Sequence, residues 1–252
     1  MSDLITWYFI KFFENEQYAD EFLQGTLFMN RLSHFKKHET ETLDGRPDKN
    51  EAISMWLQPE GINITLTAPT GEKIDMGVIT SPISSSSSYH GNAHIFCMYT
   101  VETTGFLPKD GKIKLSPAEF LQFKHQIRID ERCVNFGPYA VVIKATPFIP
   151  ILHNALINCG NAFSGKRVEY YDGTTFNGTF EPEDIPFRKQ HQFSFQKEFR
   201  ICIYTQTTGS DPLKIEVGDI SAICIKMDSA KLNDMFESEL KYLLEEDDSL
   251  TT

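Results

Sequence analysis

The stretch FSFQKEFRICIY, residues 193–204, has the pattern of a long strand with one apolar and one polar face. Side chains alternate between the two faces of a strand, so the phenylalanines and isoleucines are expected on one side, interrupted only by Lys197. Gln196, Glu198 and Arg200 are expected on the other side, with neighbours about 7 Å apart. An amide, a carboxylate and a guanidinium in such a row can bind a ribose hydroxyl and a phosphate together. The row also fits the solvated face of a half-buried strand, with Glu198 and Arg200 as a surface ion pair.

Further strand patterns are spread along the chain, with helices scattered between them. Residues 6–13, 94–101 and 139–145 are short apolar runs, typical of buried strands. A helix is predicted to end at Gly25, and an amphipathic helix over residues 230–244 has an apolar stripe that predicts docking on the core. Because no regular alternation of strand, helix and parallel strand occurs, the predicted class is α+β, with mixed, mainly antiparallel sheets.

The chain is long and apolar enough for one sizeable core, with 252 residues and a hydrophobic fraction of 40%. We predict a single α+β domain over residues 1–244. Residues 81–88 include five consecutive serines, which add nothing to a core and predict a flexible loop. Residues 245–252 open with an acidic run, which predicts a solvated tail.

The charge and the cysteines restrict the possible partners and the compartment. A formal charge of −11 argues against broad nucleic-acid binding, which needs clustered Lys and Arg. A local basic pocket is compatible with this net charge. No signal-peptide pattern opens the chain, and no apolar run reaches the roughly 20 residues that cross a bilayer. Five cysteines, an odd number without metal-binding spacing, indicate reduced thiols. These features predict a cytoplasmic protein that does not interact with membranes.

Two histidine pairs, His34/His38 and His90/His94, have the one-turn spacing that binds metal on a helix. Neither pair has a third ligand at motif spacing, and zinc sites normally use three or four protein ligands. We therefore expect no metal and no permanently bound cofactor.

The triplet Gln196-Lys197-Glu198, followed at once by Phe-Arg-Ile-Cys-Ile, resembles the Gln/Glu-x-Glu motif of ADP-ribosyltransferases. In that superfamily the second acid holds the nicotinamide ribose while the glycosidic bond breaks. The resemblance implies that NAD is the substrate and that Glu198 and Gln196 are the catalytic residues.

The same resemblance implies the residues that bind NAD. Lys11 and Arg200 would hold the phosphates, and Tyr170 or Tyr171 would stack on nicotinamide. Where the family has an arginine or a histidine on its first strand, this chain has Lys11. The Ser-Thr-Ser strand of one branch of the family is absent.

The N-terminal third is similar to uncharacterised bacterial and prophage proteins that share a Tyr-Ala-x-x-Phe-Leu-x-Gly helix and a Met-Asn-x-Leu turn. Two functional hypotheses stay open. The first is an NAD-dependent transferase or NAD-consuming effector of the toxin or antiviral-defence type, with a nucleotide substrate. The second is a non-catalytic acidic interaction protein, such as a phage-encoded inhibitor or regulator, with a protein partner.

Overall fold

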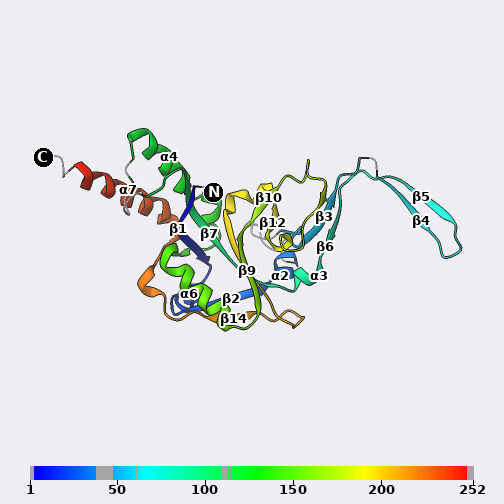
Figure 1. The fold of residues 1–252 in the computed structure, drawn as a ribbon, viewed down its shortest axis with the longest axis horizontal. Coiled ribbons are helices and arrows are strands. Elements are labelled where there is room, and N and C mark those ends of the chain that lie inside the picture. Colours follow the sequence, from blue (N-terminus) through cyan, green and yellow to red (C-terminus); the bar gives the residue numbers. More distant parts are fainter. Residues whose placement is uncertain (1–2, 38–47, 61, 109–112, 114, 249–252) are drawn as a thin grey trace.

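The computed structural model describes residues 3–37, 48–60, 62–108, 113 and 115–248 (Figure 1). Its main sheet has eight strands: β1 (Leu4–Phe13), β2 (Thr26–Arg31), β7 (His94–Thr104), β8 (Tyr139–Lys144), β9 (Ala162–Arg167), β13 (Glu198–Tyr204), β14 (Leu213–Glu216) and β15 (Cys224–Asp228). Every pairing in this sheet is antiparallel. The short strands β10 (Glu169–Tyr171) and β12 (Arg188–Gln190) pair in parallel. The prediction of an α+β protein with mainly antiparallel sheets is confirmed.

Strand β7 is the centre of the main sheet and has three partners. β13 pairs with residues 94–99 of β7, β1 with residues 99–104, and β2 with residues 94 and 95. β1 leaves β7 after Ile10 and continues along β8. Residues 96–98 of β7 therefore pair with β13 but with neither β1 nor β2, and the space between these two strands positions the candidate site.

Helices cover both faces of the sheet. They are α1 (Glu16–Leu23), α2 (Leu32–Lys37), α3 (Ser88–Gly91), α4 (Pro117–Ile127), α5 (Glu131–Val134), α6 (Ala145–Asn158) and α7 (Leu232–Asp248). Short 3-10 helices are η2 (Ile185–Phe187), η3 (His191–Gln196), η4 (Ser221–Ile223) and η5 (Ser229–Lys231). Phe22 of α1 and Phe148 of α6 pack on Phe9 and Ile201 in one core cluster. Apolar residues of α4 and α7 pack in a second cluster.

Helix α7 buries Leu232, Phe236 and Leu240, so the apolar stripe docks on the core as predicted. Helix α7 continues through Asp248, so residues 245–248 of the predicted acidic tail are helical. Extending an existing helix costs little compared with nucleating one, and glutamate is a good helix former. Residues 249–252 lie outside the described residues. Among those described, no helix is long and apolar enough to cross a membrane.

A ribbon of strands extends from the body. β3 (Ile53–Leu57) pairs with β6 (Ile83–Ser86) and with β11 (Gly178–Thr179). Beyond them β4 (Asn63–Thr67) and β5 (Lys73–Val78) form a two-stranded hairpin that projects away from the rest of the molecule (Figure 1). The prediction of a flexible loop over residues 81–88 is wrong at its centre, because residues 83–86 form β6 and Ser88 begins α3. Strand pairing needs only backbone groups, so the serine side chains of β6 can stay exposed.

Candidate functional site

The polar strand of the sequence begins later than its pattern predicts. Residues 191–196 form η3, Lys197 adopts a left-handed backbone with φ 38°, and β13 starts at Glu198. The carbonyl of Lys197 accepts hydrogen bonds from the Thr100 N–H at 2.9 Å and the Thr100 hydroxyl at 2.8 Å, which fixes this turn against β7. The prediction that Gln196 shares a strand face with Glu198 is therefore wrong.

Glu198 and Arg200 do lie on one face of β13, but this face is not solvated. The two side chains are 6% and 1% exposed. The Arg200 Nε donates to a Glu198 carboxylate oxygen at 2.7 Å. Since both groups are buried, the interpretation as a surface ion pair is wrong.

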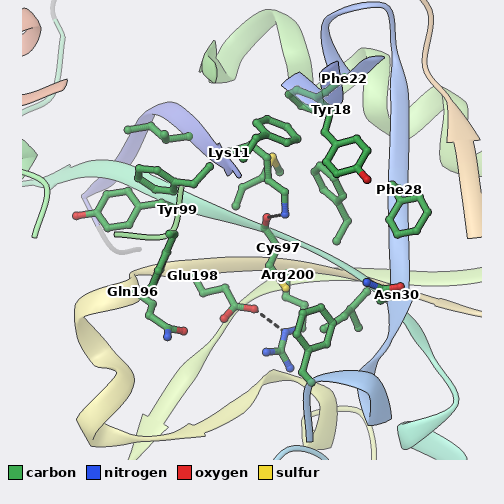
Figure 2. A pocket seen from close by; sticks show the side chains of 18 of the residues that line it. Lys11, Tyr18, Phe22, Phe28, Asn30, Cys97, Tyr99, Gln196, Glu198 and Arg200 are labelled. Atoms are coloured by element: carbon green, nitrogen blue, oxygen red, sulfur yellow. Dashed lines mark hydrogen bonds and ion pairs between the residues drawn. The ribbon is translucent and has the colours of Figure 1, made fainter. Parts of the chain in front are cut away.

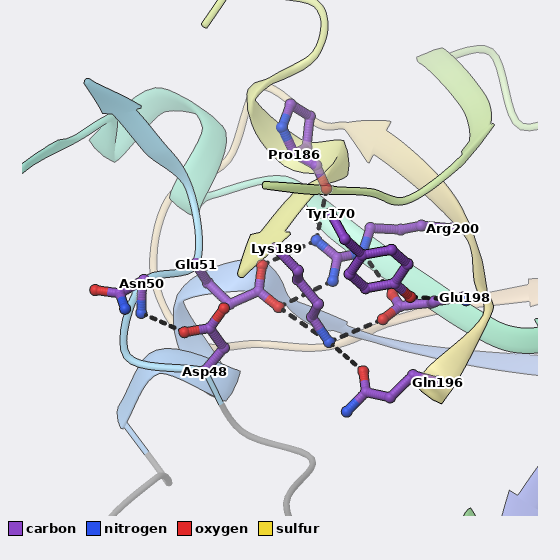
Figure 3. A network of polar contacts seen from close by, with 9 residues as sticks. All are labelled: Asp48, Asn50, Glu51, Tyr170, Pro186, Lys189, Gln196, Glu198 and Arg200. Carbon is purple, nitrogen blue, oxygen red and sulfur yellow. Dashed lines mark hydrogen bonds and ion pairs between the residues drawn. The ribbon is translucent and has the colours of Figure 1, made fainter. Parts of the chain in front are cut away.

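The Glu198–Arg200 pair is half of a buried network of four charges (Figure 3). Two guanidinium nitrogens of Arg200 donate to the two carboxylate oxygens of Glu51, each at 2.9 Å. The Lys189 ammonium donates to Glu198 at 2.8 Å and to the side-chain oxygen of Gln196 at 2.7 Å. Two carboxylates and two cations balance, which is the condition under which buried charges are tolerated. Lys189 thus holds Gln196 next to Glu198 by donating to both side chains. The sequence pattern predicts the same proximity for a different reason, namely that both residues lie on one face of a strand.

Glu198 and Lys189 keep their charges at neutral pH. Burial raises the pKa of Glu198, but the guanidinium of Arg200 and the ammonium of Lys189 outweigh burial and hold this pKa well below its ordinary value. Burial lowers the pKa of Lys189, whereas the carboxylates of Glu198 and Glu51 raise it, and the net result is a raised pKa. Glu198 is therefore a carboxylate and Lys189 an ammonium ion.

This network borders a cavity of about 580 Å³ at the space between β1 and β2. Gln196, Glu198, Arg200 and Lys11 all line it. Figure 2 shows Gln196, Glu198 and Arg200 at one end, with Lys11 and Cys97 in the middle. The structure thus brings together four of the six site residues that the sequence predicts.

The ammonium of Lys11 lies in the cavity and hydrogen-bonds a backbone carbonyl in the segment of β7 that pairs with neither β1 nor β2. The acceptor is the Cys97 carbonyl, at 2.7 Å. The same ammonium lies 4.5 Å from the ring centroid of Phe96. A cation is therefore held at the middle of the cavity, although this sequence has neither the arginine nor the histidine of the resembled family.

The guanidinium of Arg200, which the resemblance implies would hold a phosphate, is already engaged by protein groups. It is 1% exposed and donates to Glu51, Glu198 and the Pro186 carbonyl. Its guanidinium holds the two carboxylates in place instead. The hydrogen bond from its Nε fixes the position of the Glu198 carboxylate.

The two tyrosines expected to stack on nicotinamide do not line the cavity. The Tyr170 hydroxyl accepts a hydrogen bond from the Glu198 N–H at 3.0 Å, which places the ring against the backbone of β13. Burial raises the pKa of this hydroxyl. Tyr171 packs in a separate aromatic group with Trp56, Phe176 and Phe180.

Sequence reasoning missed Glu51 and Lys189. Glu51 is 149 residues from Arg200, so no local spacing connects them. The only usable signal is that an arginine within an apolar strand needs a buried acid, and this signal does not say which acid. Lys189 lies in a mixed polar segment that has no motif of its own.

The described ranges contain no group of three or more His, Cys, Asp or Glu residues placed to hold a metal ion. The His90 Nδ1 lies 2.9 Å from the Tyr204 hydroxyl, and the His94 Nε2 lies 3.0 Å from the Asp211 carbonyl oxygen. His38 lies outside the described residues. All five cysteines are free.

Comparison of the chain with protein-family models, with curated proteins and with solved structures finds no match. The chemistry of the cavity is then the basis for a functional proposal. An ionised carboxylate at the edge of a cavity can stabilise a cationic centre in a bound molecule. Lys11 and the neighbouring aromatic side chains can bind an anionic ligand that carries planar rings.

Proposed function

We propose that the cavity binds a nucleotide, with NAD as the best candidate, and that the protein is an ADP-ribosyltransferase-like or NAD-hydrolysing enzyme. The observation that supports this most is the position of Glu198. Its carboxylate is ionised, it is fixed by Arg200 and Lys189, and it borders a cavity that also contains the Lys11 ammonium. A fixed carboxylate needs no reorganisation when positive charge develops next to it.

In the proposed reaction, the bond between the nicotinamide nitrogen and C1′ of its ribose breaks. Nicotinamide leaves as a neutral molecule with the electron pair of this bond, so C1′ and the ring oxygen share a positive charge. Glu198 stabilises this charge and hydrogen-bonds the ribose. Water, or a hydroxyl or amine of a target, then forms the new bond to C1′ and releases a proton. Gln196, held by Lys189, would position the ribose or the nucleophile.

The test is the substitution Glu198→Gln, which keeps the size of the side chain and removes its charge. We expect nicotinamide release from NAD to fall on the order of 10²–10³-fold, measured by chromatography, with NAD binding followed by calorimetry. Glu102→Gln is the matched control, because Glu102 is also an ion-paired sheet carboxylate but does not line the cavity. Circular dichroism checks that both variants fold. Failure of the wild-type protein to bind or cleave NAD would refute the proposal.

A second candidate function, a non-catalytic interaction protein, is favoured by the β4–β5 hairpin. This hairpin projects from the body and carries Leu66, Ile74 and Val78, which are 51%, 47% and 80% exposed. Exposed apolar side chains on a projecting element suit contact with a protein partner. Removal of the hairpin separates the two functions.

A further inference from the structure

Two aromatic side chains that line the cavity remain largely exposed. Tyr18 of α1 is 57% exposed and Phe28 of β2 is 49% exposed. Their neighbour Phe22 is buried and stacks on Phe96. Within the described part of the chain, neither Tyr18 nor Phe28 has an aromatic partner. The two rings therefore contribute little to the core and offer open faces at the cavity.

Phe28 is the one exposed residue of β2. Leu27 and Met29 point into the core and are fully buried, so Phe28 points the other way. Lys214 of β14 pairs directly with Phe28, and its ammonium lies 6.0 Å from the ring centroid. Lys214 also lines the cavity. An aromatic ring and a cation thus lie together at the cavity.

Different chemical groups line different parts of the cavity. In Figure 2 the Glu198 end and the rings of Tyr18 and Phe28 lie on opposite sides of Lys11. Aromatic side chains bind nucleobases by stacking, because every base has a π face. Ammonium groups attract phosphates. From one end to the other, the sequence of groups is carboxylate, cation and aromatic rings.

We propose that Tyr18 and Phe28 bind the purine ring of the nucleotide, with Lys11 and Lys214 facing its phosphates. This inference rests on the proposed function and adds the orientation of the ligand to it. The nucleoside that contains the scissile bond then lies at Glu198, and the adenosine lies at the outer, aromatic end.

The test uses fragments of the ligand in calorimetric titrations. AMP carries the purine, nicotinamide mononucleotide carries only the other half, and ADP-ribose carries the purine with both phosphates. Tyr18→Ala and Phe28→Ala are each expected to weaken AMP and ADP-ribose roughly tenfold and to leave nicotinamide mononucleotide unchanged. Tyr18→Phe keeps the ring, so it should bind AMP more tightly than Tyr18→Ala does. Tyr89→Ala is the matched control, because Tyr89 is 67% exposed and does not line the cavity.

The outcomes separate this inference from the function on which it rests. If the wild-type protein binds and cleaves NAD but the two alanine variants bind AMP as tightly as wild type, the orientation is wrong and the function stands. If the variants weaken nicotinamide mononucleotide instead of AMP, the ligand lies the other way round and the inference fails. If no fragment and no NAD binds to the wild-type protein, both are refuted. Thermal unfolding of each variant confirms that the loss of affinity does not come from loss of the fold.

Discussion

At the scale of single residues, the network of four buried charges fixes the position of the Glu198 carboxylate and keeps it ionised. Glu51, Lys189, Glu198 and Arg200 are all at most 6% exposed, and each is paired with an opposite charge. Burying these groups carries a large desolvation cost, which pairing offsets only when every member is present. The network is therefore weak evidence for stability, but it fixes the carboxylate of Glu198 in one place. A fixed, charged group at a cavity is the arrangement that electrostatic catalysis uses.

Removing one member of the network should destabilise the protein strongly. Lys189→Met keeps much of the side chain's bulk and leaves two carboxylates with one cation. We expect the free energy of unfolding to fall by about 3–5 kcal/mol, measured by urea denaturation. Lys166→Met is the control, since Lys166 forms a partly exposed pair with Asp184 and should cost less than about 1 kcal/mol. Equal effects of the two substitutions would show that the network is not desolvated in solution.

The stability of the protein should also depend on pH through Glu198. Arg200 and Lys189 hold its pKa below the ordinary value of 4.5, so the unfolded chain binds a proton at a higher pH than the folded protein does. The stabilisation is complete above about pH 4.5 and is lost as the pH falls below it. Urea midpoints between pH 7 and pH 3 should therefore drop less for Glu198→Gln than for wild type. Parallel curves for the two proteins would contradict the lowered pKa.

At the scale of elements, the divergence of β1 and β2 from β7 creates the site. The turn between α1 and β2 sets the start of β2. Gly25 in this turn has φ +106°, and its carbonyl accepts from the Val217 N–H at 2.9 Å. Because the backbone of Gly218 lies against its Cα, there is no room for a side chain at this position. The turn thus joins α1 and β2, which carry Tyr18 and Phe28, to the end of β14.

Gly25→Ala should lower the melting temperature, because a Cβ here would overlap the backbone of Gly218 and occupy a strained φ. We expect a loss of about 1–3 kcal/mol or more, measured by thermal unfolding. Gly209→Ala separates the two causes, since Gly209 also has a positive φ, +123°, but has open space around it. If both variants lose the same stability, the strained φ and not the contact with Gly218 is responsible.

The sequence predicts the elements better than it predicts the site. Apolar runs identify β1, β7 and β8, since continuous apolar strands are typical of a buried sheet centre. The alternation of apolar and polar residues predicts a strand at residues 193–197, but residues 191–196 form a 3-10 helix and the turn at Lys197 is fixed by Thr100 of another strand. The sequence also gives no prediction that Glu51 and Lys189 belong to the site, for a similar reason. Their positions depend on which strands meet in space, and the chain carries no local signal for that.

At the scale of the whole molecule, the cavity and the β4–β5 hairpin lie in different parts of the structure. The cavity is surrounded by strands of the main sheet and the elements packed on it. The hairpin is connected to this body through β3 and β6, and among the described strands β4 and β5 pair only with each other. The two proposed functions, nucleotide chemistry and protein contact, therefore depend on separate structural elements, so each can be tested without the other.

Removal of the hairpin should leave the fold and the cavity intact. Leu57 of β3 and Ile83 of β6 are direct partners, so a short turn can join the two strands in place of residues 59–81. We expect the melting temperature to change by no more than a few degrees, because a surface hairpin with exposed apolar residues adds little to the core. NAD binding measured by calorimetry should equal that of the full chain.

Leu66→Ser with Val78→Ser is the milder control, since both side chains are exposed and neither lines the cavity. If the shortened protein folds and cleaves NAD but loses its effect in cells, the hairpin contacts a partner. If it loses NAD binding while it remains folded, the separation of cavity and hairpin is wrong.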